Sequence, residues 1–111
     1  MGSRNAVQYY SGTGANDNDV LFTAGNVEKH SEFTLMSTTG AVDVFVSLDG
    51  SNFSTAALAM EDQGATAMTT YVLVTAALRV YKFSGKYRAI RVLQNGATAT
   101  QATLMCGSPG V

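Results

Sequence analysis

The sequence predicts an all-β fold: a single antiparallel β-sandwich of about seven or eight strands, jelly-roll-like or Ig-like, with an extended N-terminal arm. The first observation is a strict alternation over residues 42–48, which places four aliphatic side chains on one face of a strand: Val42, Val44, Val46 and Leu48. The second is the Asp49-Gly50 pair that follows, because glycine supplies the positive φ that reverses a β-chain. The third is that short apolar runs recur between turn residues further along the chain. A closed barrel fits the same pattern.

The remaining elements follow from local patterns of apolar and turn residues. The segments that we expect to form strands are, in chain order, 20–24, 32–38, 41–48, 54–60, 66–75, 78–83, 87–93 and 97–106. Segment 54–60 is rich in alanine and fits a short helix as well as an edge strand. Thr39-Gly40 indicates a tight hairpin, and Asn95-Gly96 is the strongest hairpin signal of the chain.

The first nineteen residues differ from the rest of the chain. Residues 1–19 are polar, rich in Gly and Asn, and have no hydrophobic periodicity. We therefore interpret 1–19 as an extended arm and 20–111 as the sandwich domain. Tyr9 and Tyr10 are its aromatic anchors, held either by the domain's own surface or by a neighbouring subunit.

The composition is that of a one-domain protein with few charged residues. Of its 111 residues, 46% are hydrophobic and only 14% are charged, against about 25% charged in an average soluble domain. A surface with so few charges gives a free monomer low solubility, so one interpretation is that partner proteins cover part of the surface. The other is a small Thr-rich sandwich that exists alone. Phe45 supports the first interpretation, because it lies on the face opposite the valine row of an otherwise alternating strand.

Several classes of partner and compartment are excluded. The net charge of −1 provides no basic field for nucleic acid. No apolar run approaches the roughly 20 residues of a membrane span. Cys106 is the single cysteine and is expected to be a small buried hydrophobe. Residues 1–5 lack the apolar run of a signal peptide, so we expect synthesis in a reducing cytosol.

Basic residues concentrate late in the chain. Five of the seven lie within 79–91: Arg79, Lys82, Lys86, Arg88 and Arg91. A solvated sheet face is one explanation of this stretch. A basic patch that contacts an acidic protein partner is the other.

Candidate catalytic and metal-binding residues do not form a site. His30 has no nucleophile beside it and is expected to be a surface loop histidine. Residues 16–19 carry calcium-type oxygens, but their spacing matches no EF-hand loop and favours turns that cap their own backbone. Asp49 suits its turn, and Glu61-Asp62 lies in a polar turn, so neither indicates a glycosidase. We therefore predict a protein that is not an enzyme, with no metal and no cofactor.

The aromatic residues allow one binding hypothesis. Four of them could form a sugar-stacking platform like those of carbohydrate-binding sandwiches: Tyr9, Tyr10, Phe53 and Tyr87. Anchoring of the arm and packing of the core explain the same residues without a ligand.

Two motifs carry a resemblance. Val-x-Val-x-Val-Ser-Leu-Asp-Gly-Ser-Asn-Phe over 42–53, followed by Gly-Lys-Tyr-Arg-Ala-Ile-Arg-Val over 85–92, resembles small β-sandwich proteins of tailed-bacteriophage virions. The resemblance covers roughly residues 32–106 and ends with the Thr/Ala-rich segment 97–106. The same pattern occurs in discoidin-like and carbohydrate-binding sandwiches, so it is specific to a fold family more than to a role.

The resemblance implies a capsid decoration, or cement, protein. Such a protein lies on the capsid surface of the virion, binds the major capsid protein as lattice-bound copies or a homo-oligomer, and stabilises the head. The residues that we expect to contact the partner are Arg4, Tyr9, Tyr10, Phe45, Arg79, Arg88 and Arg91. A tail, collar or fibre-attachment component is one alternative, and a host-glycan-binding module is the other.

Overall fold

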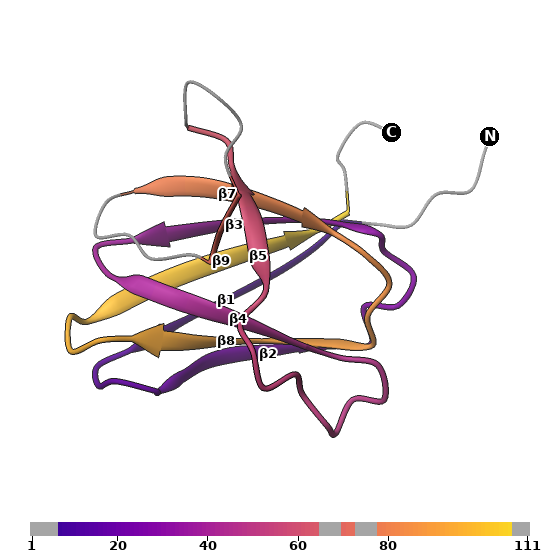
Figure 1. The fold of residues 1–111 in the computed structure, drawn as a ribbon, viewed down its shortest axis with the longest axis horizontal. Helices are drawn as coiled ribbons and strands as arrows, with labels where there is room; N and C mark the ends of the chain where they lie inside the picture. Colours follow the sequence, from indigo (N-terminus) through magenta and orange to yellow (C-terminus); the bar gives the residue numbers. More distant parts are fainter. Residues whose placement is uncertain (1–6, 65–69, 73–77, 108–111) are drawn as a thin grey trace.

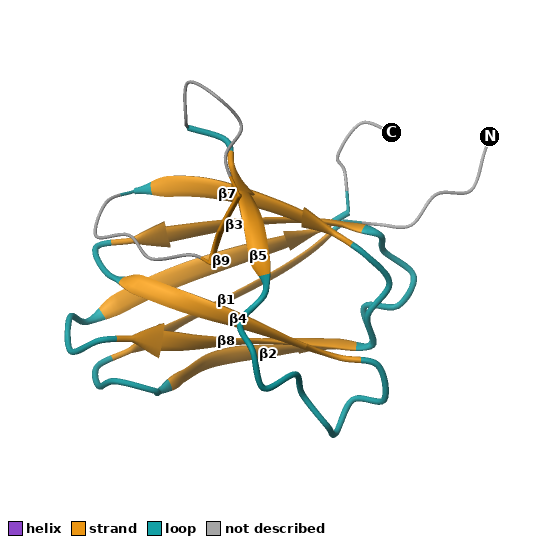
Figure 2. Ribbon diagram, in the orientation of Figure 1, coloured by secondary structure: helices purple, strands orange, loops and turns teal. Residues whose placement is uncertain are grey.

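The computed structural model describes residues 7–64, 70–72 and 78–107. These residues form nine strands: β1 (Gln8–Gly14), β2 (Val20–Gly25), β3 (Glu32–Thr38), β4 (Ala41–Ser47), β5 (Ala59–Asp62), β6 (Thr70–Val72), β7 (Arg79–Ser84), β8 (Ala89–Asn95) and β9 (Thr100–Cys106). Within the described ranges the chain contains no helix (Figure 2), and so none long and apolar enough to cross a membrane.

The strands form two antiparallel sheets that pack face to face (Figure 1). One sheet has six strands in the order β1-β9-β3-β7-β5-β6, and the other has three in the order β2-β8-β4. The predicted sandwich is therefore confirmed, and the barrel is not adopted. Segment 54–60 contributes the start of β5 and no helix, while most of the predicted strand 66–75 lies outside the described residues.

The core lies between the inner faces of the two sheets. Strand alternation sends Val42 and Val44 of β4 inward, against Leu35 of β3 and its neighbours. Phe33 stacks on Phe83, with ring centroids 5.1 Å apart. Fully buried side chains fill the space between the sheets: Phe33, Leu35, Val42, Val44, Ile90, Val92, Leu104 and Cys106. Cys106 is thus buried as predicted, and burial raises the pKa of its thiol to about 11.

The two predicted hairpins are wrong. Thr39-Gly40 joins β3 of the six-stranded sheet to β4 of the three-stranded sheet, and Asn95-Gly96 lies in the connection from β8 to β9. The physical reason is that β3 is already paired on both edges, with β7 and β9, and β8 is paired on both edges, with β2 and β4. Each turn reverses the chain, but it passes the chain to the other layer.

The interpretation of 1–19 as an arm outside the domain also needs correction. Residues 8–14 are strand β1, which pairs with β9 along its whole length, from Gln8↔Cys106 to Gly14↔Thr100. β1 has no apolar periodicity because two of its inward positions are glycines. A Cβ atom on Gly12 would lie 1.9 Å from the carbonyl oxygen of Leu21, so the close approach of β1 to β2 requires glycine there.

Candidate functional site

The Asp49 loop between β4 and β5 is held rigid by its own polar groups. The Ser47 hydroxyl accepts hydrogen bonds from the backbone N–H groups of Asp49 (3.3 Å) and Gly50 (2.9 Å), and donates one to Asp49 Oδ1 (3.0 Å). Asp49 in turn accepts from the N–H groups of Ser51 and Asn52, both at 2.8 Å, and from Asn52 Nδ2. These donors, Asn52 first, hold the pKa of Asp49 well below its usual value. Asp49 therefore stabilises its own turn, as the sequence indicated.

The chain after this loop covers the free edge of β4. Phe53 forms a bridge with Ser47, Ser54 N–H donates to the Val46 carbonyl (2.9 Å), and Leu58 N–H donates to the Val44 carbonyl (2.8 Å). Irregular chain therefore satisfies backbone groups along the β4 edge of the three-stranded sheet, which protects this edge from edge-to-edge pairing.

The outer side of the three-stranded sheet brings together two of the predicted contact residues, Phe45 and Arg91. Thr23, Arg91 and Phe45 form one row across β2, β8 and β4. The Arg91 guanidinium carbon lies 4.0 Å from the ring centroid of Phe53, within cation–π distance. We call this surface, made of Asp43, Phe45, Phe53, Arg91 and Leu93, the three-stranded face.

The loop forms a ridge with a hollow on each side. Leu48, expected inside with the valine row, lies on this ridge and is 77% exposed, because the strand ends at Ser47. The hollow on the β4 side has a volume of about 540 Å³ and is lined by Val46, Leu48, Asp49, Asn52, Phe53, Ser54 and Tyr87. The second hollow, of about 310 Å³, lies between the ridge and the start of β8, and Thr23, Asp49 and Arg88 are among its lining residues.

The basic stretch 79–91 does not form one patch. Arg79 forms an ion pair with Asp62, Lys82 lies 3.7 Å from Glu32, and the Arg88 side chain lies 3.9 Å from Glu28. β7 belongs to one sheet and β8 to the other, so strand alternation and the crossover between sheets disperse these cations. The solvated-face explanation fits this arrangement better than the basic patch does.

The N-terminal contact residues also separate. Tyr9 is 65% exposed on the outer face of the six-stranded sheet, whereas Tyr10 turns inward and donates a hydrogen bond to the Gly25 carbonyl (3.3 Å). Arg4 lies outside the described residues. The four aromatics of the sugar platform therefore do not gather, although Phe53 and Tyr87 line the same hollow.

The remaining catalytic and metal candidates have structural roles. Glu61 is exposed and Asp62 is buried, because the two alternate along β5 and face opposite ways. Asp19 accepts from the N–H groups of Ala15 (3.1 Å) and Asn16 (2.9 Å), the self-capping turn that the sequence favoured. In the described part of the chain, no group of three or more His, Cys, Asp or Glu side chains could hold a metal ion.

His30 is buried, which contradicts the prediction of a surface residue. It is only 4% exposed, and its Nε2 lies 2.8 Å from Gln8 Oε1. Burial lowers the pKa of His30 below its ordinary value of 6.5, and the nearby charges of Lys29 and Lys86 lower it further. Gln8 of strand β1 contacts the ring on one side and Gly107, just after β9, lies close to Nδ1, so a sequence interpretation that left 1–19 outside the domain could not detect this burial.

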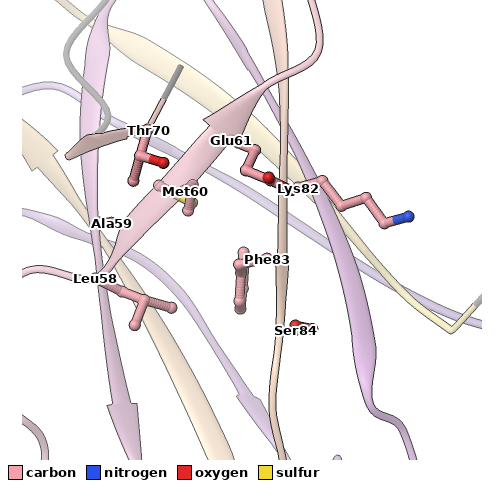
Figure 3. A pocket seen from close by; sticks show the side chains of 8 residues that line it. All are labelled: Leu58, Ala59, Met60, Glu61, Thr70, Lys82, Phe83 and Ser84. Atoms are coloured by element: carbon pink, nitrogen blue, oxygen red, sulfur yellow. The ribbon is translucent and has the colours of Figure 1, made fainter. Parts of the chain in front are cut away.

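A cleft of about 320 Å³ lies where β5 diverges from β7 (Figure 3). Pairing between these strands extends only over Glu61↔Lys82 and Asp62↔Tyr81, so Leu58 and Phe83 lie on opposite walls. Lys82 points its ammonium group away from Phe83 (Figure 3). The described lining residues are Leu58, Ala59, Met60, Glu61, Thr70, Lys82, Phe83 and Ser84, a set without a nucleophile and base in contact.

The sequence interpretation missed two residues of the three-stranded face, Asp43 and Leu93. The signal was present: both lie on the Phe45 and Arg91 side of their strands by simple alternation. Their adjacency became visible only with the register, which pairs Asp43 with Leu93 next to the pair Phe45 and Arg91.

Comparison with known proteins shows the fold. No protein-family model matches the sequence, and no curated protein matches it. The structure is similar to the crystal structure of the SPBc2 prophage-derived protein YomS, with a TM-score of 0.65 and 8% identity over 96% of this chain and 100% of that chain. A structure described as Bacillus endospore appendages, disulfide-linked pili, has a TM-score of 0.39 and 14% identity over 92% of this chain and 85% of that chain. At 8% identity, the likeness to YomS shows a shared all-β fold.

Proposed function

We propose that this chain is a non-enzymatic structural protein of a bacteriophage virion, specifically a capsid decoration protein. In this role it binds the lattice of the major capsid protein on the outside of the head and stabilises the shell. The supporting observation is that its fold matches a prophage-derived protein over 96% of this chain and 100% of that chain.

The surface of the domain suits a function carried out by contact. Large apolar side chains stay exposed on both sheets and on the loop, among them Tyr9, Met36, Leu48 and Val72. Charged residues make up only 14% of the chain. A copy seated on a lattice can contact more than one subunit at once, so several small interfaces together hold it on the shell.

Heads purified with and without this protein test the proposal. Virions of the phage that encodes the chain are compared with virions from a deletion of its gene. We expect the protein to copurify with heads at a constant ratio to the major capsid protein, and heads that lack it to release DNA at a lower temperature. A protein found only in a tail or collar ring, or absent from virions, would contradict capsid decoration.

The hollow beside Phe53 and Tyr87 favours a second candidate, a host-glycan-binding module. Its lining combines apolar walls with the polar side chains of Asp49, Asn52 and Ser54, a composition that suits sugar rings. A glycan array is the direct test. Binding by the wild type that is lost in Phe53→Ala and Tyr87→Ala would support this candidate, and an array without signal would exclude it for the glycans sampled.

A further inference from the structure

Arg91 differs from the other cations of the sheets. Arg79, Lys82 and Arg88 each lie beside a carboxylate. Among the described residues, no carboxylate lies within ion-pair distance of Arg91, and its buried Nε has no hydrogen-bond partner. Its guanidinium is held in place by the Phe53 ring at 4.0 Å. The group is oriented and partly desolvated, yet its charge is not neutralised.

Asp43 is the complementary case on the same face. Among the described residues, its side chain accepts hydrogen bonds only from the neutral side chain of Asn95, at 3.2 and 3.3 Å, and no cation pairs with it. Burial raises the pKa of Asp43. Asp43 and Arg91 are diagonal neighbours across β4 and β8, but no ion pair joins them, and Arg91 lies against Phe53 instead.

The surroundings of these two charges resemble the centre of a protein interface. Phe45 lies directly across from Arg91, and Leu93 lies across from Asp43, both partly exposed. Aromatic and arginine side chains dominate interface hot spots. Because the Asp49 loop fixes Phe53 through its hydrogen bonds, little ordering is left to occur on binding, which favours affinity.

We propose that the three-stranded face is the surface through which this protein docks on the phage shell. The site on the shell protein presents a carboxylate to Arg91, set among apolar side chains that cover Phe45 and Leu93, with a hydrogen-bond donor for Asp43. This inference rests on the proposed function and adds the face and the chemistry of recognition.

The size of the face favours a lattice over a second copy of this chain. One strand of six residues and two of seven present roughly 330 Å² of sheet, whereas a stable isolated complex buries about 800 Å² per partner. A two-fold dimer through this face alone would fall short of that area, whereas a copy seated on a shell can also contact a second shell subunit or a neighbouring copy, which joins several small contacts in one bound molecule.

The test measures binding of purified variants to heads taken from the gene-deletion phage. Arg91→Leu removes the charge, and Leu93→Glu places an acid in the apolar part of the face. Lys82→Leu is the matched control, because Lys82 is a cation on the outer face of the other sheet. We expect Arg91→Leu to weaken binding about tenfold or more, Leu93→Glu to do the same, and Lys82→Leu to bind like the wild type. The affinity of Arg91→Lys for heads should lie between those of the wild type and Arg91→Leu, because lysine keeps the charge but cannot stack on the Phe53 ring as the planar guanidinium does.

Each outcome separates the inference from the proposed function. If Arg91→Leu and Leu93→Glu both bind heads as tightly as the wild type, the inference about the face is wrong, while the proposal of capsid decoration is unaffected. Binding to isolated tails in place of heads overturns the proposed function, and the same variants then test the face on tails. Binding to neither particle overturns both. A wild-type dimer that Arg91→Leu converts to a monomer in sedimentation overturns the shell as occupant and assigns the face to a second copy. Circular dichroism melting confirms that each variant is folded.

Discussion

Replacing Gly12 with alanine tests whether β1 is an integral strand. In a segment that is mobile in the folded protein, Gly→Ala leaves stability nearly unchanged, because it reduces the freedom of the folded and unfolded chains alike. In the structure, the new Cβ would lie 1.9 Å from the Leu21 carbonyl oxygen and 2.7 Å from its carbon. The two interpretations of residues 1–19 therefore predict different results: almost no change for a mobile arm, and a clear loss of stability for a packed strand.

The magnitude follows from the displacement that the contact demands. Carbon and oxygen atoms approach to about 3.3 Å, so β1 must move away from β2 by more than about 1 Å. Overpacking of this kind costs about 2–3 kcal/mol. For a chain of this length, each kcal/mol lowers the melting temperature by about 4 °C, which predicts a fall of about 8–12 °C.

Thermal unfolding followed by circular dichroism measures this effect. Gly25→Ala is the matched control, because a Cβ on Gly25 would meet no atom within 4 Å and its φ is not positive. We expect Gly25→Ala to melt at or slightly above the wild-type temperature. A Gly12→Ala protein that melts as high as the control would refute the close packing of β1 on β2.

Three further substitutions probe the core, the ion pair of the buried Asp62 carboxylate, and the buried histidine. Leu35→Ala should destabilise the fold by about 2–5 kcal/mol in urea unfolding, because it leaves a cavity between the sheets; a loss below 1 kcal/mol, as a rough limit, would contradict its burial. Arg79→Met should cost about 3 kcal/mol by leaving the Asp62 carboxylate, 1% exposed, without its cation, and the double variant Arg79→Met/Asp62→Leu should recover part of that loss. Stability should fall as pH drops below 6.5, because the folded state lowers the pKa of His30 and the unfolded chain binds the proton more readily. His30→Gln should reduce this pH dependence, and an unchanged profile would assign it to other groups.

The strands were predictable where one face is apolar and turns follow. The prediction for 32–38 coincides with β3, and the Asp49-Gly50 turn was recognised from its residue types alone. Pairing was not predictable in the same way. Thr39-Gly40 and Asn95-Gly96 specify a reversal of the chain, but which strands pair depends on which edges other strands already occupy.

The wrong predictions for residues 8–14 and for His30 have the same physical cause. Gly12 and Gly14 occupy inward positions of β1, so the strand carries no apolar alternation. The close packing of β1 on β2 nevertheless requires glycine at position 12, because a side chain there would clash with Leu21. Once β1 was missed, the residue it covers could not be recognised as buried. The three-stranded face was half predicted: Phe45 and Arg91 were chosen from sequence, and the register added Asp43 and Leu93.

A cryo-electron microscopy reconstruction of the phage head would show directly where this protein binds. We expect density for one sandwich at each of many equivalent positions on the outer shell, with the three-stranded face of β2, β8 and β4 against the major capsid protein. Heads from the gene deletion should lack this density. A wild-type head with a bare shell, or sandwich density confined to the tail, would contradict the account.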